Sequence, residues 1–502
     1  MGRHRARRLL EVVAQMRLLA LPVLVLVSLE PQAYAQNAAS QPITVGSAVV
    51  SGSLRSRTYA WNWFGDTAGG DYAYPGSLLR VSVAQSKTAL DWLLEAAVPV
   101  LVSLPQTAIA PAPRGQLGLG ASYFAANANS RNAAAFFIKQ GAVRFKGLAG
   151  IEGQSLKLGR MEFNDGTEVT PKDASLADLK RDRVSQRLLG TFGFSDVGRS
   201  LDGALYSLSR KTLNVTVVVG RPTQGVFQVD GWGELKVNLA YAALTGQIGG
   251  QTGTGEWRVF ALAYDDARDR VVKTDNRQAS ARNVDFESTA IATYGGHYVR
   301  EVATPAGPVD LLVWGAVQNG SWGALAHRAG AFSIEAGWQP TRFDRLRPWF
   351  RGGYDYASGD HDPTDQRHGT FFQVLPTPRV YARFPFYNMM NSADAFGELT
   401  VRPSDKLSVR TDVHAVRLAD RNDFWYSGGG AFQPSTFGYT GRPSNGETGL
   451  STLSDVSGDY RVNARLSLGL YYGYASGRAV TQAIYSSSDG AHLGYAELLL
   501  RF

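Results

Sequence analysis

The sequence predicts an all-β protein built as a single transmembrane antiparallel β-barrel, and three observations carry that prediction. Residues 491–502 alternate polar and apolar side chains and stop on Phe502, as a strand with one wet and one lipid face would. Similar alternation recurs along the chain, joined by alternately short and long connections. After residue 35 no apolar run reaches the roughly eighteen residues that a membrane-spanning helix needs.

The first 35 residues are predicted to be a secretory signal peptide. Basic side chains precede an apolar stretch at 18–29, and Ala33-Tyr34-Ala35 fits a small-residue cleavage site. Cleavage after Ala35 would leave one domain, residues 36–502, as the barrel. Export from the cytoplasm to a bacterial outer membrane follows from the two predictions together.

Composition agrees with a barrel and excludes several kinds of site. The chain has no cysteine, which rules out lipid anchoring through cysteine, disulfides, thiolate metal sites and covalent haem. Aromatic residues make up 11% and glycines number 55, which suits aromatic girdles and tight turns. Mean hydropathy is −0.17, as expected when every second strand residue faces water. The formal charge of +8 matters only if the basic residues gather in a pore.

Period-two patterns predict about eighteen strands of about ten residues. The clearest lie near 54–63, 79–84, 90–98, 134–145, 156–163, 213–219, 257–263 and 491–502. Others centre on Val237, Ile291, Val313, Ile334, Phe350, Phe396, Val409, Leu453 and Leu470.

Connections are predicted to be short on the periplasmic side and long on the outside. Short turns are expected at 85–87, 341–344, 403–405 and 461–463, and long loops at 164–199, 265–282, 359–391 and 420–450. Within the first long loop, residues 174–189 could form a short helix. The loops at 164–199 and 359–391 are the predicted gates.

Three segments resemble the alginate-export family of outer-membrane channels. They are residues 72–80 (YAYPGSLLR) after the Arg55-x-Arg57 strand, residues 156–166 (LKLGRMEFNDG), and residues 358–363 (SGDHDP) followed by Gly369-Thr-Phe371. The resemblance covers nearly all of the mature chain. It implies an eighteen-strand barrel with an arginine-rich constriction for an acidic polysaccharide.

Ten charged residues are predicted to line the pore or bind its cargo, because their strand neighbours alternate with apolar residues. Guanidinium groups pair with carboxylates in a planar fork, and a ladder of weak sites favours passage over trapping. The alternative is that these arginines pair with Glu95, Glu162, Asp412 or Glu497 and only fill the barrel. The ten are Arg55, Arg57, Arg80, Arg144, Arg160, Glu162, Arg351, Asp355, Arg410 and Asp412.

The function predicted from these features is conduction or export of an anionic, alginate-like polysaccharide. The alternative is a general or substrate-specific porin for small anionic solutes or nutrients. The chain is expected to act as a monomer in outer-membrane lipid, with a possible periplasmic export scaffold and without cofactor or nucleic acid.

An enzymatic role is not expected, because no nucleophile–base motif appears and Ser408 with His414 is the only pair to consider. A purely structural or adhesive barrel is a further alternative. The acidic and histidine residues at 360–368 match no defined metal motif, so no metal site is predicted.

Overall fold

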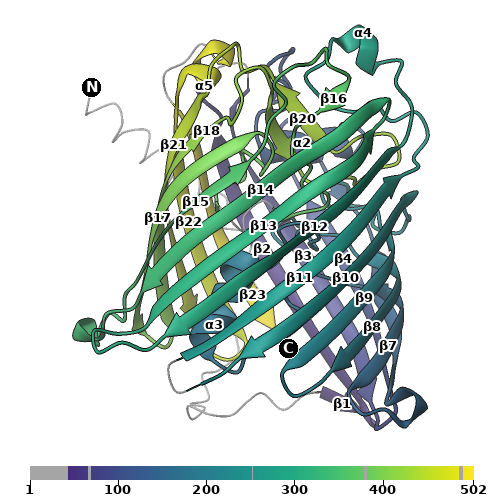
Figure 1. The fold of residues 1–502 in the computed structure, drawn as a ribbon, viewed down its shortest axis with the longest axis vertical. Coiled ribbons are helices and arrows are strands. Elements are labelled where there is room, and N and C mark those ends of the chain that lie inside the picture. The colour runs from purple at the N-terminus through teal and green to yellow at the C-terminus, as the bar shows by residue number, and fades with distance from the viewer. Residues whose placement is uncertain (1–42, 66–68, 251–252, 378–381, 486–489) are drawn as a thin grey trace.

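The chain folds into one closed β-barrel, which confirms the predicted fold class (Figure 1). The computed structural model describes residues 43–65, 69–250, 253–377, 382–485 and 490–502. Within these residues, eighteen antiparallel strands form the wall. The predicted signal peptide lies outside the described residues and stays a prediction.

The wall strands follow one another around the barrel in chain order. The first nine are β2 (Ala48–Asn62), β3 (Asp71–Ser86), β4 (Leu90–Leu101), β6 (Phe137–Lys146), β7 (Gln154–Met161), β8 (Leu201–Ser209), β9 (Leu213–Pro222), β10 (Val237–Ile248) and β11 (Gly253–Asp266). The second nine are β12 (Thr289–Val302), β13 (Val309–Trp322), β14 (Leu325–Trp338), β15 (Trp349–Ala357), β17 (Ser392–Ser404), β18 (Leu407–Arg417), β21 (Gly449–Arg461), β22 (Leu466–Gly477) and β23 (Ala491–Arg501).

Short strands and helices accompany the eighteen wall strands. The short strands are β1 (Ile43–Val45), β5 (Ala133–Ala134), β16 (Arg367–His368), and the hairpin of β19 (Trp425–Gly428) and β20 (Tyr439–Arg442). The helices are α2 (Leu119–Ala126), α3 (Ala174–Leu179), α4 (Ala279–Arg282) and α5 (Ala479–Ile484), with single turns η2 (Leu148–Gly150), η3 (Lys180–Val184) and η4 (Thr341–Phe343). None of the helices in the described part is long and apolar enough to cross a membrane.

The barrel closes where its last strand meets its first. β23 pairs antiparallel with β2, and Arg57 lies opposite Glu497. The chain end continues the ladder, since Phe502 donates its N–H to the Gly52 carbonyl at 3.0 Å and accepts from the Gly52 N–H at 2.8 Å. Closure satisfies the backbone groups of both edge strands, which have no water to bond with in a bilayer.

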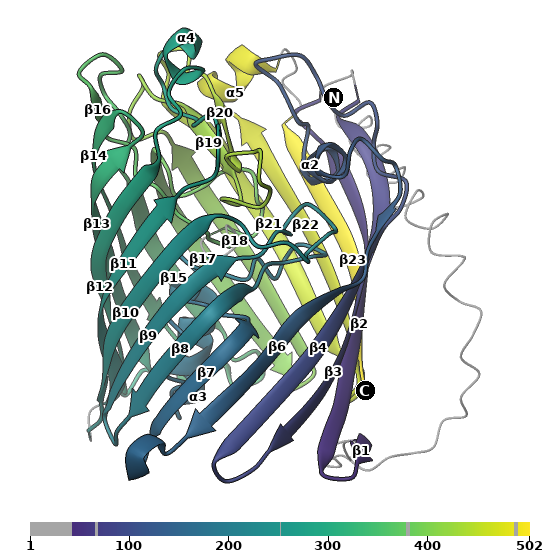
Figure 2. The ribbon, with the colours of Figure 1, turned by 90° about the vertical axis from the view of Figure 1, so that its right-hand side faces the viewer.

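The two ends of the barrel differ as predicted, with short connections at one end and long ones at the other (Figure 2). In such barrels the short-turn end faces the periplasm. The short connections include 87–89, 210–212, 405–406 and 462–465, and the long ones include 102–132, 162–200, 267–288, 358–391 and 418–448.

One strand was not predicted, and one helix is shorter than expected. β8 has no clear alternation of polar and apolar side chains. Its three leucines are divided between the two faces of the strand, and Gly203 and Ser207 share a face with two of them. The predicted helix at 174–189 is found as α3, which begins at Ala174, but helical structure ends with the π-helical turn η3 at Val184.

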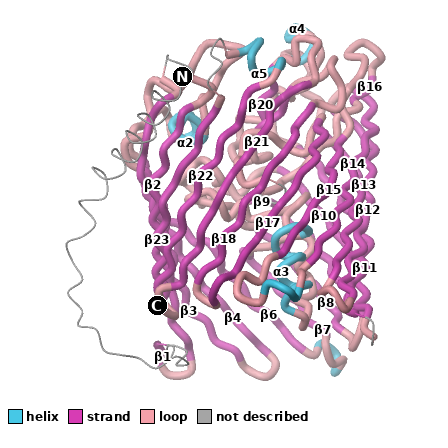
Figure 3. Tube along the Cα trace, turned by 90° about the vertical axis from the view of Figure 1, so that its left-hand side faces the viewer, coloured by secondary structure: helices cyan, strands magenta, loops and turns pink. Residues whose placement is uncertain are grey.

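Long loops fold back into the lumen. Figure 3 shows α3 enclosed by the barrel wall, toward the periplasmic end. In the outer half, the loops 358–391 and 418–448 bury aromatic rings against the wall: the rings of Phe384 and Trp61 lie 5.7 Å apart, and those of Trp425 and Trp63 lie 6.3 Å apart. The largest hydrophobic core therefore lies inside the barrel, formed by loops and inner wall.

A row of three glycines crosses three neighbouring strands of the wall. Gly159 lies opposite Gly203, which in turn lies opposite Gly220, on β7, β8 and β9. A Cβ at Gly203 would overlap the Val219 carbonyl oxygen, and one at Gly220 would lie 2.6 Å from the Asp202 carbonyl oxygen. The strands approach each other closely here because these three positions carry no side chain.

We expect Gly203→Ala to destabilise the barrel by about 1–3 kcal/mol, because backbone atoms cannot move aside cheaply. Urea unfolding of the protein in lipid vesicles measures this difference. Gly397→Ala is the matched control, since no heavy atom lies within 4 Å of a Cβ at Gly397 on β17. Equal stability of the two variants would contradict the steric account.

Candidate functional site: an arginine-lined lumen

The first inward loop, residues 162–200, is fastened to the wall beside the barrel seam. Arg55 donates to the Gly193 carbonyl at 2.6 Å, and Arg57 pairs with Glu497 while also donating to the Phe194 carbonyl. Tyr59 donates its hydroxyl to Asp196 at 3.0 Å. The two arginines predicted on β2 thus face the lumen and hold this loop.

The same loop is tied to the opposite part of the wall by buried ion pairs. Arg183 contacts Glu335 at 2.8 Å, and Arg187 contacts Glu335 at 2.9 Å and Asp355 at 3.2 Å. Arg351 bonds Asp310 and lies 3.4 Å from Glu335. Carboxylates of β14 and β15 are therefore shared among several guanidinium groups, which offsets the cost of burying these charges.

A third attachment lies on β11. Arg258 contacts Glu168 at 3.1 Å and Asp165 at 3.5 Å, and Lys180 contacts Glu256 at 2.7 Å. Loop 162–200 is therefore held from three directions, and it crosses the lumen as a fixed constriction.

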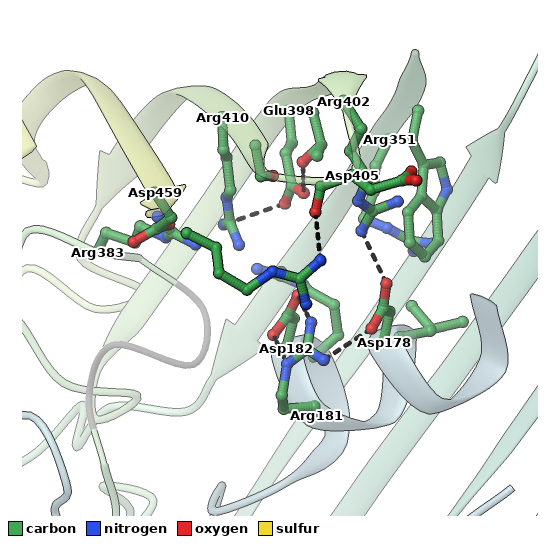
Figure 4. A pocket seen from close by; sticks show the side chains of 16 residues that line it. Asp178, Arg181, Asp182, Arg351, Arg383, Glu398, Arg402, Asp405, Arg410 and Asp459 are labelled. Atoms are coloured by element: carbon green, nitrogen blue, oxygen red, sulfur yellow. Dashed lines mark hydrogen bonds and ion pairs between the residues drawn. The ribbon is translucent and has the colours of Figure 1, made fainter. Parts of the chain in front are cut away.

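A cavity of about 660 Å³ lies between this constriction and the wall (Figure 4), and its lining includes Asp405 of the short turn 405–406. Its lining contains seven arginines and five carboxylates, so arginines are in excess. The lining residues are Asp178, Leu179, Arg181, Asp182, Arg183, Trp349, Arg351, Arg383, Glu398, Thr400, Arg402, Asp405, Ser408, Arg410, Asp459 and Arg461.

The cavity arginines are arranged by exchangeable polar contacts. Arg402 pairs with Asp178 at 2.8 Å, Arg181 pairs with the same carboxylate at 2.7 Å, and Arg410 pairs with Glu398 at 3.0 Å. Arg402 also lies over the Trp349 ring, 5.8 Å from its centroid. Arg383, from the outer loop 358–391, reaches down to bond the Ser457 hydroxyl. A carboxylate entering the cavity would meet guanidinium groups from both loops and from the wall.

The other predicted residues lie on the inner face with one exception, and each is paired. Arg80 contacts both Glu95 and Glu162, the latter at 2.9 Å. Arg144 bonds Asp91, and its side chain is 50% exposed. The Arg410–Asp412 pair lies on β18 at 2.6 Å. In the structure, these arginines are therefore paired with carboxylates inside the barrel, as the alternative prediction described.

Arg160 is the exception: it lies on the outer face, although the alternation with Glu162 predicted a lumen position. Leu158, two residues earlier on β7, is 42% exposed with the lipid-facing residues, and Arg160 pairs with Asp202 at 2.7 Å. β7 ends at Met161, so the alternation stops there. Glu162 then turns inward with the loop and contacts Lys139 and Arg80.

Sequence reasoning missed most of the arginines that line the cavity. Arg181 and Arg183 lie in the segment 174–189, which was predicted as a short helix and given no role in the pore, and Arg383 lies in an outer loop. The run at 180–183 (KRDR), inside the predicted helix, was a usable signal, because a charged helix inside a barrel has to meet opposite charges on the wall.

The two outer loops meet at a pair of buried carboxyl groups. Asp360 donates its N–H to Asp423 at 2.9 Å, and burial raises the pKa of Asp360 to about 7 and that of Asp423 to about 6. In the described part of the chain, no group of three or more histidine and acidic side chains is arranged to hold a metal ion. His414, on β18, is buried against Asp394 at 2.7 Å.

We expect Arg187→Met to loosen the constriction, because Glu335 and Asp355 each lose a buried partner at a cost of about 3 kcal/mol. Single-channel recordings would then show a larger and noisier conductance than the unaltered protein. Arg221→Met is the control, since the Arg221 side chain lies on the outer face, is 44% exposed and pairs with Glu234. If the Arg187→Met channel kept the conductance and current noise of the unaltered protein, the buried ion pairs of Arg187 would not be what holds loop 162–200 in place.

The raised pKa values of Asp360 and Asp423 predict that the outer loops pack less tightly as pH rises. A carboxyl with a higher pKa in the packed state stabilises packing fully below about pH 4 and loses that contribution on passing about pH 6–7. Proteolysis of loops 358–391 and 418–448 should therefore be faster at pH 8 than at pH 5. In Asp360→Asn the step near pH 7 should be absent; its persistence would contradict the assignment.

Comparisons with known proteins agree with this architecture. Three similar solved structures are OccK11 (OpdR) of Pseudomonas aeruginosa (12% identity, 91% of this chain and 96% of that one, TM-score 0.50), OccAB2 of Acinetobacter baumannii (9%, 90% and 98%, 0.55), and OccK2 (OpdF) of Pseudomonas aeruginosa with glucuronate (8%, 91% and 96%, 0.53). At these identities the likeness concerns the fold, and no curated relative matches the sequence.

The family comparison is more specific. The model described as "Alginate export" matches residues 122–492, which is more than half of the chain. That match includes the inward loop 162–200, the wall from β6 through β22, and every residue that lines the cavity. The chain belongs to the alginate-export family of bacterial outer-membrane channels.

Proposed function

We propose that this outer-membrane channel conducts small carboxylate-bearing solutes, about the size of a uronic acid, and selects them in the arginine-lined cavity. The observation that carries the proposal is the cavity itself, with seven arginines facing about 660 Å³ beside the constriction. A low-dielectric wall concentrates the field of such groups and raises the local concentration of anions.

Passage would proceed by exchange of partners. Arg402 and Arg410 already hold carboxylates, Asp178 and Glu398, in contacts close to 3 Å. An incoming carboxylate can replace these oxygens one at a time without leaving a guanidinium unpaired. Several comparable sites in sequence favour entry and release, whereas one tight site would block the pore.

The outer half of the lumen is filled by loops, and this filling favours small cargo. Loops 358–391 and 418–448 bury aromatic rings there, which leaves little room for a continuous polymer. Two structurally similar channels support the same size class: OpdK was solved with vanillate and OccK2 with glucuronate, both small carboxylates.

Export of an acidic polysaccharide is the second candidate, and the family match favours it. It would require loop 358–391 to withdraw from the lumen, carrying Arg383 with it. The predicted periplasmic scaffold belongs to this candidate. That scaffold and the monomeric state stay predictions.

The test is the reversal potential of the refolded protein in a planar bilayer under a salt gradient. We expect preference for anions, block of the current by millimolar glucuronate, and weaker selectivity in Arg402→Gln and Arg383→Gln. A polymer of uronate that blocks at far lower carboxylate concentration than the monomer would favour the second candidate.

Arg221→Gln is the matched control. Arg221 lies on the outer face beyond the exposed Val219, pairs with Glu234 at 2.8 Å and should not alter selectivity. A channel without anion preference, or one in which Arg221→Gln and Arg402→Gln have equal effects, would contradict the proposal.

A further inference from the structure

One periplasmic turn, residues 339–348 between β14 and β15, differs from its neighbours in length and composition. Prolines at 340 and 348 bracket the sequence Thr-Arg-Phe-Asp-Arg-Leu-Arg, and η4 begins the turn. Arginines and apolar residues alternate within it. The adjacent turns 405–406 and 462–465 are much shorter.

Both kinds of side chain in this turn face solvent. Phe343 and Leu346 are each 49% exposed, although nothing in the loop's length prevents them from turning inward. Among the described residues, no hydrogen bond or ion pair engages the guanidinium groups of Arg342 and Arg345. Arg347 alone is fixed, through Asp405 at 2.8 Å and the Arg402 carbonyl at 2.9 Å. The backbone of the turn is thus anchored while two arginines and two apolar side chains project from it.

The turn continues the lipid-facing surface of the wall. Trp338, the last residue of β14, and Phe350, opposite it on β15, are 41% and 43% exposed, and their rings stack 6.2 Å apart. Aromatic rings at this position are typical of the boundary between hydrocarbon and headgroups. In Figure 1 the turn that follows β14 projects outward from the base of the barrel rather than into the pore.

Further basic residues lie on the neighbouring turns of the same rim. Lys406 follows β17, Arg465 precedes β22 and Arg501 ends β23, and all three are exposed. The turns 339–348 and 405–406 themselves carry the carboxylates Asp344 and Asp405, and Arg347 holds the latter. The rim on this side of the barrel is therefore basic where it meets the membrane.

We propose that the turn 339–348 binds anionic phospholipid headgroups of the inner leaflet. Arg342 and Arg345 would contact lipid phosphates, while Phe343 and Leu346 insert among the glycerol and upper acyl groups. Alternation of basic and apolar side chains next to an aromatic girdle favours a lipid surface over a soluble acidic protein, which would leave the two apolar side chains in water. Anchoring here would fix the base of β15 and β17, which border the cavity.

Native mass spectrometry of the detergent-solubilised full chain tests the proposal, with phosphatidylglycerol and phosphatidylcholine as probes. We expect preferential retention of phosphatidylglycerol that falls with added salt. The double variant Arg342→Gln/Arg345→Gln should bind it roughly thirtyfold more weakly at low ionic strength. Phe343→Ser should weaken retention of both lipids.

The matched control is Arg210→Gln/Lys211→Gln, which removes two cations from the periplasmic turn 210–212 on another side of the barrel. A difference in gel migration between heated and unheated samples verifies that each variant is folded. Equal phosphatidylglycerol affinity in the two double variants, or retention that ignores headgroup charge, would overturn the proposal and point instead to a soluble acidic partner.

Discussion

The constriction depends on buried pairs between arginine and carboxylate groups that join loop 162–200 to the wall. Burying a guanidinium or a carboxylate alone is costly, and removing one partner leaves the other uncompensated. Arg187 and Glu335 are both completely buried, and each has further charged partners. Because Arg55 and Arg57 hold the other end of the loop, its path across the lumen is set by the strands to which it is tied. The cavity lies where the loop passes beside β17 and β18, and the Asp178–Arg402 pair joins the loop to β17 there.

This arrangement gives the lumen arginines two roles. Those on β2 act on the backbone of the loop and position it, and those around the cavity contact carboxylates that cargo can replace. Predicted pore residues such as Arg57 therefore belong to the architecture, whereas Arg402 and Arg383 are the groups that solutes would meet. The outer loops add a second layer, in which aromatic packing and the Asp360–Asp423 pair close the external half.

Most of the wall could be predicted from the sequence, because strand alternation reflects a direct physical choice between lipid and water. That logic identified β23 from its terminal alternation and placed Arg55, Arg80 and Arg410 on the inner face. It missed β8, whose glycine and small residues carry little pattern. It also misplaced Arg160, because alternation is valid only within a strand and β7 ends at Met161. The cavity was beyond reach, since its residues come from two loops and four strands whose meeting depends on long-range ion pairs.

If solutes pass through the arginine-lined cavity, chemical modification of a thiol that faces this cavity will alter the current. The chain has no cysteine, so a single introduced thiol can be modified selectively. We would record current through Arg402→Cys channels while adding a cationic methanethiosulfonate reagent, with Arg221→Cys on the outer face as reference. The account predicts a stepwise change in current and in anion preference at Arg402→Cys alone. Modification of Arg402→Cys that leaves both unchanged would place the conduction path elsewhere and contradict it.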